Sequence, residues 1–143
     1  MTESSPVVLV IDDDREIRML LQEVLVQEGY RVLIAGTAEV GQAQCLFARP
    51  ALVLVDYRLP GRNGDEFITW YRDDFRSSGP VIAMSASRPP EWVTSHETFI
   101  AKPFDLGVLL EAVRAALART NAQPEPEPMR DDQPRIASEC AGR

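Results

Sequence analysis

The sequence predicts an α/β protein in which helices cover both faces of one doubly wound, five-stranded parallel sheet. Five short segments are almost wholly apolar, and they alternate with segments whose apolar residues recur every three or four positions. A short apolar run bounded by turn residues is typical of a strand buried on both faces, and the second spacing is typical of an amphipathic helix. Because crossovers between parallel strands are right-handed, this alternation predicts a sheet between two layers of helices.

Each predicted strand is a run of four or five mostly apolar residues that a glycine or a polar residue follows. The third run is the clearest, because five apolar residues lead directly into Asp56, and turn residues such as Pro60 and Gly64 come soon after it. The five runs are Val7–Ile11, Arg31–Ala35, Ala51–Val55, Pro80–Met84 and Thr98–Ala101.

Four of the segments between and after the strands have helical periodicity. Asp14 is a suitable N-cap for the first helix, Gly29 is a suitable residue just beyond its end, and Thr37 can cap the second. The third and last helices are expected to begin near residues 65 and 105. The apolar residues expected to face the sheet are Ile17, Leu20, Leu21, Val24 and Leu25, then Val40, Ala43, Leu46 and Phe47, then Phe67, Ile68 and Tyr71, and finally Leu106, Leu109, Leu110, Val113 and Leu117.

Length and composition predict one globular domain with a polar tail. The chain has 143 residues, 45% of them hydrophobic and 26% charged, which is enough to bury a core of ordinary size. Residues 1–119 are expected to form the domain. Residues 120–143 contain four prolines, no aromatic residue and one large aliphatic residue. We therefore expect this Pro-rich segment to be a disordered tail.

Charge and cysteine content exclude several classes of function. The net charge is −7, which argues against direct binding of nucleic acid, because phosphate contacts need a basic face. The N-terminus has no basic region, and Val7–Ile11 is too short for a signal sequence or a membrane span. Cys45 and Cys140 are expected to be reduced thiols. We therefore expect a cytoplasmic protein without membrane contacts.

Polar residues follow four of the five predicted strands, at the point where each strand ends. They are Asp12 and Asp13, Asp56, Ser85, and Lys102. In a parallel sheet these ends meet at one edge, which is where ligands bind. Three carboxylates at one place repel one another unless a cation lies among them, and oxygen ligands suit Mg²⁺. A lysine and a hydroxyl beside that cation could bind a phosphoryl group that Asp56 accepts as a nucleophile.

With these motifs in this order, the chain resembles the receiver domain of two-component response regulators, and among them a single-domain response regulator. The resemblance rests on Asp12-Asp13, Asp56, Pro60 with Gly64, Ser85-Ala86 and Lys102-Pro103-Phe104, and it covers residues 7 to about 118. It implies a flavodoxin-like fold, independently of the apolar pattern. It also implies a cis bond before Pro103.

The resemblance implies a role for each site residue. Asp56 would take a phosphoryl group from the phosphohistidine of a sensor histidine kinase, or from a phosphotransfer protein. Asp13 would bind Mg²⁺ directly, Asp12 would help to hold it, and the backbone carbonyl of Arg58 would complete the protein ligands together with Asp56. Ser85 and Lys102 would bind phosphoryl oxygens. In such a switch the aromatic side chain of Phe99 moves inward as Ser85 moves.

The segment between Ala86 and Phe99 departs from the receiver pattern. Receiver domains have a fuller helix there, whereas this segment contains Pro89-Pro90 and leaves about seven residues for a helix. We therefore expect a shortened or irregular fourth helix.

Three functions remain open at this point. The leading hypothesis is a phosphorylatable switch that acts on a downstream protein as a monomer or a phosphorylation-linked dimer, and that is not an enzyme beyond its own phosphorylation and dephosphorylation. A second is a receiver-fold module that binds proteins without phosphorylation. The third is a small haloacid-dehalogenase-like phosphohydrolase that uses Asp12 and Asp14. That family expects Thr or Val where Glu16 stands.

Overall fold

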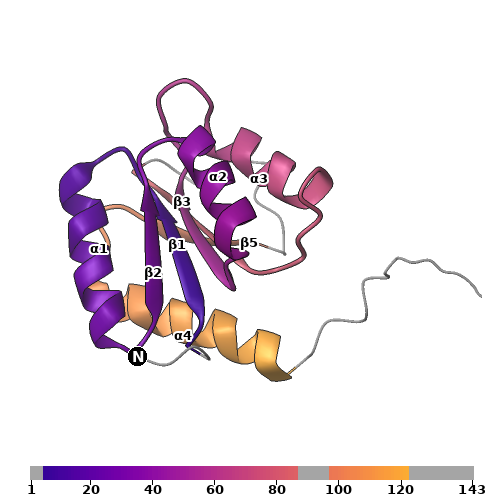
Figure 1. Ribbon diagram of the computed structural model, residues 1–143. Coiled ribbons are helices and arrows are strands. Elements are labelled where there is room, and N and C mark those ends of the chain that lie inside the picture. The colour runs from indigo at the N-terminus through magenta and orange to yellow at the C-terminus, as the bar shows by residue number, and fades with distance from the viewer. Residues whose placement is uncertain (1–4, 87–96, 123–143) are drawn as a thin grey trace, which may run out of the picture.

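The structure is a computed structural model that describes residues 5–86 and 97–122. It contains one five-stranded sheet in the order β2-β1-β3-β4-β5, and every neighbouring pair of strands is parallel (Figure 1). The predicted doubly wound parallel sheet is thereby confirmed. The strands are β1 (Val7–Ile11), β2 (Arg31–Ala35), β3 (Leu52–Asp56), β4 (Val81–Ser85) and β5 (Glu97–Ala101), and the helices are α1 (Arg15–Gln27), α2 (Ala38–Ala48), α3 (Gly64–Asp73) and α4 (Leu106–Ala122).

The two faces of the sheet are covered by different helices. α1 and α4 lie on one face, and α2 and α3 lie on the other (Figure 1). Along β1, Val8 and Val10 pack in the first core, whereas Leu9 and Ile11 pack in the second. This alternation follows from the two-residue period of a strand. Because both of their faces are buried, the central strands β1, β3 and β4 are nearly continuous apolar runs, which makes them recognisable in the sequence.

Local signals place the helix ends as predicted. The Asp14 carboxylate accepts hydrogen bonds from the backbone N–H of Glu16 and Ile17, and the Thr37 hydroxyl accepts one from Val40. Gly29 follows the C-cap of α1 with a φ of +98°, a conformation in which a side chain would be strained. These caps fix where α1 and α2 begin, directly after the ends of β1 and β2.

The predicted inner face of α2 is wrong. Val40, Ala43, Leu46 and Phe47 were expected to face the sheet, but all four are exposed, Leu46 by 70% and Phe47 by 82%. The buried residues are Ala38, Gly41 and Cys45. The reason is close packing: a Cβ at Gly41 would lie 2.5 Å from Cδ1 of Ile11, so this helix approaches the sheet through small residues. In α1, Leu20 is also exposed rather than buried, at the margin of a stripe centred on Leu21 and Leu25.

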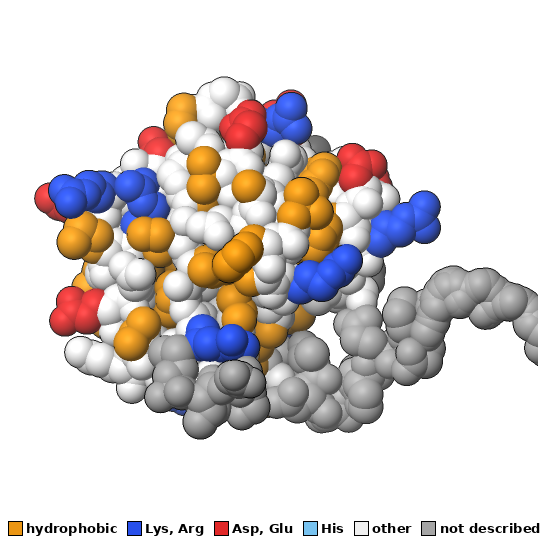
Figure 2. Space-filling view, viewed as in Figure 1, with side chains coloured by type: hydrophobic (Ala, Val, Ile, Leu, Met, Phe, Trp, Pro, Cys, Tyr) orange, Lys and Arg blue, Asp and Glu red, His pale blue; other side chains and the backbone are white. Residues whose placement is uncertain are grey.

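The outward face of α2 is therefore apolar. Its sequence from Val40 to Ala48 contains no charged residue. Figure 2 views the molecule from the side on which α2 lies in front. Orange side chains and white atoms fill the middle of this surface, and most of the charged side chains in view lie nearer its margin.

The other predicted faces are confirmed. Phe67, Ile68 and Tyr71 of α3 are buried, as are Leu109, Val113 and Leu117 of α4. Cys45 is a free, buried thiol, and burial raises its pKa to about 12. Within residues 5–86 and 97–122, none of the helices has the length and apolar character needed to cross a membrane.

Several predictions fall outside the described part of the chain. These are the shortened fourth helix between residues 87 and 96, the thiol at Cys140, and the disorder of the tail. α4 continues to Ala122, past position 120 at which the tail was expected to begin.

Candidate functional site

The ends of four parallel strands bring the predicted site residues to one edge of the sheet. β3 ends in Asp56 and β4 ends in Ser85, while Asp12 directly follows β1 and Lys102 directly follows β5. Backbone hydrogen bonds tie neighbouring ends together: the N–H of Lys102 donates to the carbonyl of Ser85 over 2.7 Å. The geometric prediction that these residues converge is thereby confirmed for Asp12, Asp56 and Lys102, whose side chains are in contact.

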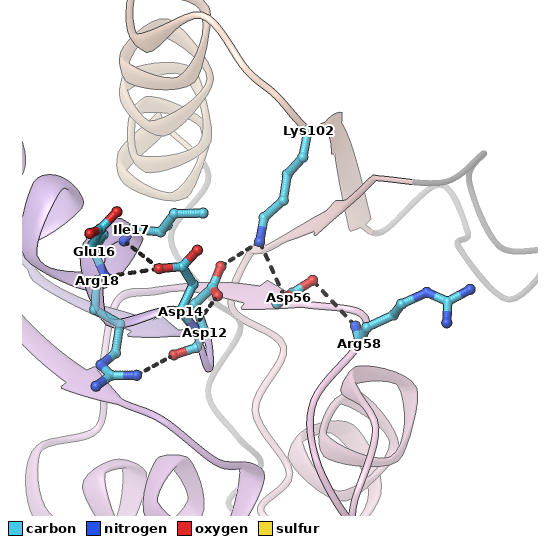
Figure 3. A network of polar contacts seen from close by, with 8 residues as sticks. All are labelled: Asp12, Asp14, Glu16, Ile17, Arg18, Asp56, Arg58 and Lys102. Atoms are coloured by element: carbon cyan, nitrogen blue, oxygen red, sulfur yellow. Dashed lines mark hydrogen bonds and ion pairs between the residues drawn. The ribbon is translucent and has the colours of Figure 1, made fainter.

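Lys102 forms an ion pair with two buried carboxylates. Its Nζ lies 2.7 Å from Oδ2 of Asp12 and 3.2 Å from Oδ2 of Asp56 (Figure 3). The Asp12 side chain is fully buried, and those of Asp56 and Lys102 are largely buried. The peptide bond between Lys102 and Pro103 is cis, as the resemblance implied. The ammonium group therefore lies between two acidic side chains that come from different strands.

Backbone N–H groups hold the second oxygen of each of these carboxylates. Oδ1 of Asp12 accepts a hydrogen bond from the N–H of Asp14 over 2.9 Å, and Oδ1 of Asp56 accepts one from the N–H of Arg58 over 3.2 Å. Each carboxylate thus has one oxygen toward the backbone and one toward Lys102. Their orientations are set before any ligand binds.

Asp13 completes a cluster of three carboxylates with Asp12 and Asp56. One oxygen from each lies within 4.8 Å of the others, and Asp13 is exposed while its two partners are buried. An all-oxygen set with one side open to water fits a hard cation such as Mg²⁺, which keeps several of its waters. The three carboxylates are therefore chemically suited to the predicted Mg²⁺ site. The carbonyl of Arg58 as a further ligand stays a prediction.

Burial and neighbouring charges shift the pKa values of two groups. Burial is the largest cause that raises the pKa of Asp56, the negative charge of Asp12 raises it further, and Lys102 opposes both effects. For Lys102, burial lowers the pKa, but the hydrogen bonds and charges of Asp12 and Asp56 outweigh burial and raise it. Lys102 therefore keeps its charge at neutral pH, and Asp56 is the group whose ionisation is made unfavourable.

This shift predicts how stability depends on pH. Because the folded protein holds the Asp56 proton to higher pH than the unfolded chain does, the associated stability is complete below the ordinary value of 3.8 and is lost as the pH rises through the raised pKa. We expect Asp56→Asn to lack this loss and to be more stable than the wild type at pH 7. Urea unfolding of both proteins between pH 4 and 8, with a chelator present, measures the free energy of unfolding at each pH. If this free energy depends on pH in the same way in both proteins, the prediction is wrong.

Ser85 and Phe99 lie on adjacent strands at or near the edge of the sheet that holds the site, and their roles in the switch stay predictions. Ser85 is buried at the end of β4, in register with Ala101, the residue before Lys102. Phe99 is half-buried in β5, in register with Ala83. Ser85 is thus on β4, and Phe99 is on the adjacent β5, which also carries Lys102 to the site.

Gly64 allows α3 to begin directly against the Asp56 backbone. Its N–H donates to the carbonyl of Tyr57 over 2.8 Å. A Cβ added at Gly64 would lie 2.5 Å from the carbonyl oxygen of Asp56 and 2.8 Å from Cα of Tyr57. Only glycine fits without a shift of this backbone, which explains why a glycine stands at the start of α3, close behind Asp56.

We expect Gly64→Ala to lower the free energy of unfolding by about 1 to 3 kcal/mol, because the added methyl group displaces backbone rather than a flexible side chain. The same shift moves Asp56, so metal affinity should fall as well. Chemical unfolding and Mg²⁺ titration measure the two effects. A variant that matches the wild type in both would show that α3 can move away without disturbing Asp56.

One contact of the site was not predicted from the sequence. The Arg18 guanidinium donates from Nη1 to the backbone carbonyl of Asp12 over 2.8 Å (Figure 3). Its acceptor is a main-chain oxygen, so no pairing of charged residue types indicates the contact. The only available signal is that Arg18 follows the N-cap Asp14 by about one helical turn.

Comparison with known proteins supports the resemblance to receiver domains. The family model for the response regulator receiver domain matches residues 8–114. KdpE of Escherichia coli (strain K12), the KDP operon transcriptional regulatory protein, is 33% identical over 127 residues, covering 85% of this chain and 56% of KdpE. The DNA-binding response regulator MtrA of Mycobacterium tuberculosis (strain ATCC 25618 / H37Rv) is 32% identical over 122 residues, covering 82% and 53%. The chain spans about half the length of these curated relatives.

Solved structures agree with the fold over almost their whole length. A CheY-like response regulator receiver domain protein from Methanospirillum hungatei JF-1 has a TM-score of 0.77 and 27% identity, covering 83% of this chain and 98% of that one. The chemotaxis protein CheY4 of Vibrio cholerae, at 24% identity, has a TM-score of 0.73 over 79% and 99% of the two chains. Fold, site residues and family match converge, and the chain belongs to the response regulator receiver domain family, the phosphorylatable switches of two-component signalling.

Proposed function

We propose that Asp56 accepts a phosphoryl group from a sensor histidine kinase or a phosphotransfer protein, and that phosphorylation alters the binding of a downstream protein. The observation that carries this proposal is the position of Lys102 Nζ between the buried carboxylates of Asp12 and Asp56. A cation held beside a nucleophilic carboxylate is what an incoming phosphoryl group requires.

Four groups of the protein would be the ligands of a Mg²⁺ ion in this proposal. Asp12, Asp13 and Asp56, with the backbone carbonyl of Arg58, would hold it, and three of these residues already have oxygens within 4.8 Å of one another. When bound, Mg²⁺ would neutralise the negative charge of the carboxylates and of the phosphoryl oxygens. Receiver domains bind Mg²⁺ at such an acidic pocket, and the dependence of this chain on Mg²⁺ is part of the proposal.

The transfer step uses one oxygen of Asp56 as the nucleophile. That oxygen forms a bond to phosphorus while the bond from phosphorus to the donor nitrogen breaks, and the donor imidazole keeps the electron pair. Oδ1 is held by the N–H of Arg58, and Oδ2 faces Lys102. Lys102 would then pair with a phosphoryl oxygen, and the Ser85 hydroxyl would donate to another. Phe99 would follow Ser85 inward.

Output through a protein partner fits the charge of the chain. The net charge is −7, and no basic face suited to phosphate contacts was predicted. MtrA is described as DNA-binding, but this chain matches only about half of MtrA. The proposal therefore includes a cytoplasmic switch, monomeric or dimerising upon phosphorylation, that contacts neither nucleic acid nor membrane directly.

The chemical form of the product tests this proposal. After incubation with acetyl phosphate and Mg²⁺, we expect an acyl phosphate, which hydroxylamine removes and which leaves a hydroxamate at Asp56. Peptide mapping locates it. Phosphate that resists hydroxylamine, or label at another residue, would contradict the proposal. Repeated turnover of p-nitrophenyl phosphate would instead favour a phosphohydrolase.

A further inference from the structure

We propose that Arg18 is a positioning residue of the metal site: by holding the carbonyl of Asp12, it sets the orientation of the Asp12–Asp13 peptide and thereby the place of the Asp13 carboxylate. This inference rests on the proposed Mg²⁺ site and deepens it. It assigns a role to a side chain on α1 that would not itself touch the ion.

Arg18 reaches Asp12 from the capped first turn of α1. The backbone N–H of Arg18 donates to the carbonyl of Asp14 over 3.0 Å, in the first turn, which the Asp14 side chain caps. The guanidinium of Arg18 then turns back toward the end of β1, where Nη1 donates to the Asp12 carbonyl (Figure 3). The same short segment thus carries both the metal-site aspartates and the arginine that contacts them.

Gly36 leaves room for the guanidinium. A Cβ at Gly36 would lie 3.1 Å from Nη1 of Arg18, which is closer than an ordinary contact, and 3.6 Å from its Cζ, which is an ordinary van der Waals contact. Gly36 directly follows β2, and the carbonyl of its neighbour Ala35 accepts the N–H of Asp12 over 3.0 Å. The arginine therefore packs against the turn after β2 as well as against the end of β1, and both sides define its position.

With Arg18 in place, each polar group of Asp12 has a partner. Its N–H donates to the carbonyl of Ala35, and its carbonyl accepts from the guanidinium of Arg18. Its two carboxylate oxygens accept from the backbone N–H of Asp14 and from Nζ of Lys102. Because a peptide unit is planar, fixing the carbonyl of Asp12 also fixes the N–H and Cα of Asp13. Asp13 is exposed, so the orientation of this peptide is the main restraint that the site places on its side chain.

Arg18 acts in this account through a contact and not only through its charge. A guanidinium always carries a positive charge, which favours nearby carboxylates but opposes a metal cation. Removing that charge alone would therefore strengthen Mg²⁺ binding. Loss of the contact frees the Asp12–Asp13 peptide and weakens binding. The two explanations predict opposite changes in the Mg²⁺ dissociation constant.

Calorimetric titration with Mg²⁺ tests this proposal on the full chain. We expect Arg18→Gln to weaken Mg²⁺ binding by about 10-fold, the lower end for residues that orient metal ligands. Gly36→Ala keeps the arginine but presses on its guanidinium, and it should weaken binding in the same direction. Arg18→Lys, which can still donate to a carbonyl, should restore part of the affinity. The matched control Arg15→Gln removes an exposed charge from the same helix turn and should change the affinity by less than about 2-fold.

The outcomes separate this inference from the proposed function. A wild type that does not bind Mg²⁺ contradicts both. A wild type that binds, with Arg18→Gln and Gly36→Ala binding as tightly or more tightly, overturns the role of Arg18 and leaves the proposed function standing. A loss in Arg15→Gln equal to that in Arg18→Gln also overturns it. If Arg18→Gln does not fold, Gly36→Ala and Arg18→Lys decide.

Discussion

Replacing Lys102 by methionine is expected to lower the free energy of unfolding by about 3 to 5 kcal/mol at pH 7 without Mg²⁺, because it removes one partner of a buried ion pair. Methionine is an unbranched side chain only one atom shorter than lysine, but it leaves the Asp12 and Asp56 carboxylates facing each other without a cation. Urea unfolding measures the effect. The loss should shrink toward acid pH, where Asp56 takes a proton, and Mg²⁺ should restore part of it.

The matched control is an exposed ion pair in the same protein. Arg62 lies 3.6 Å from Glu39, and both side chains are about half exposed. We expect Arg62→Met to change the free energy of unfolding by less than about 1 kcal/mol, because solvent screens such pairs. Equal losses in Lys102→Met and Arg62→Met would mean that Lys102 is not held in a dry cluster, and the site geometry described above would be wrong.

Phe67→Ala is expected to lower the free energy of unfolding by about 3 to 5 kcal/mol, whereas Phe47→Ala should change it by no more than about 0.5 kcal/mol. Phe67 is fully buried in α3 and stacks on Tyr71 with ring centroids 5.7 Å apart. Phe47 on α2 is 82% exposed. Thermal and urea unfolding of the two variants measures the difference. The reverse order would restore the inner face of α2 that periodicity predicted.

The sheet could be predicted because a strand that is buried on both faces is an apolar run in the sequence. A central strand between two helix layers is apolar at nearly every position, so runs such as Leu52–Val55 stand out in the sequence alone. The polar residues that follow such runs then lie at one edge, since parallel strands end together. That is why Asp12 and Lys102, which are 90 residues apart, could be placed at one site.

The face of α2 could not be predicted, because hydrophobicity does not measure how closely a helix approaches a sheet. Large apolar residues such as Leu46 and Phe47 gave the expected stripe, but the space above Ile11 admits only small residues such as Gly41. Packing distance is a property of two elements together. Neither sequence segment contains it alone.

The site was predicted as far as side-chain chemistry could indicate it. Carboxylate, lysine and hydroxyl side chains can be read directly from the sequence. The Asp12 carbonyl that Arg18 holds is a main-chain group, which every residue has. The approach of Gly64 to the Asp56 backbone has the same character, because the sequence offers the glycine but not the atoms it must avoid. Contacts to the main chain are therefore the part of this site that required the structure.

The central claim, that Asp56 is the phosphoryl acceptor, is tested most directly by the intact mass of the protein after incubation with acetyl phosphate. Wild type and Asp56→Asn are compared with and without Mg²⁺. We predict a gain of one phosphoryl group in the wild type with Mg²⁺, and no gain in either protein without Mg²⁺ or in Asp56→Asn with it. A gain of the same size in Asp56→Asn, or in the wild type with Mg²⁺ removed by a chelator, would contradict the account.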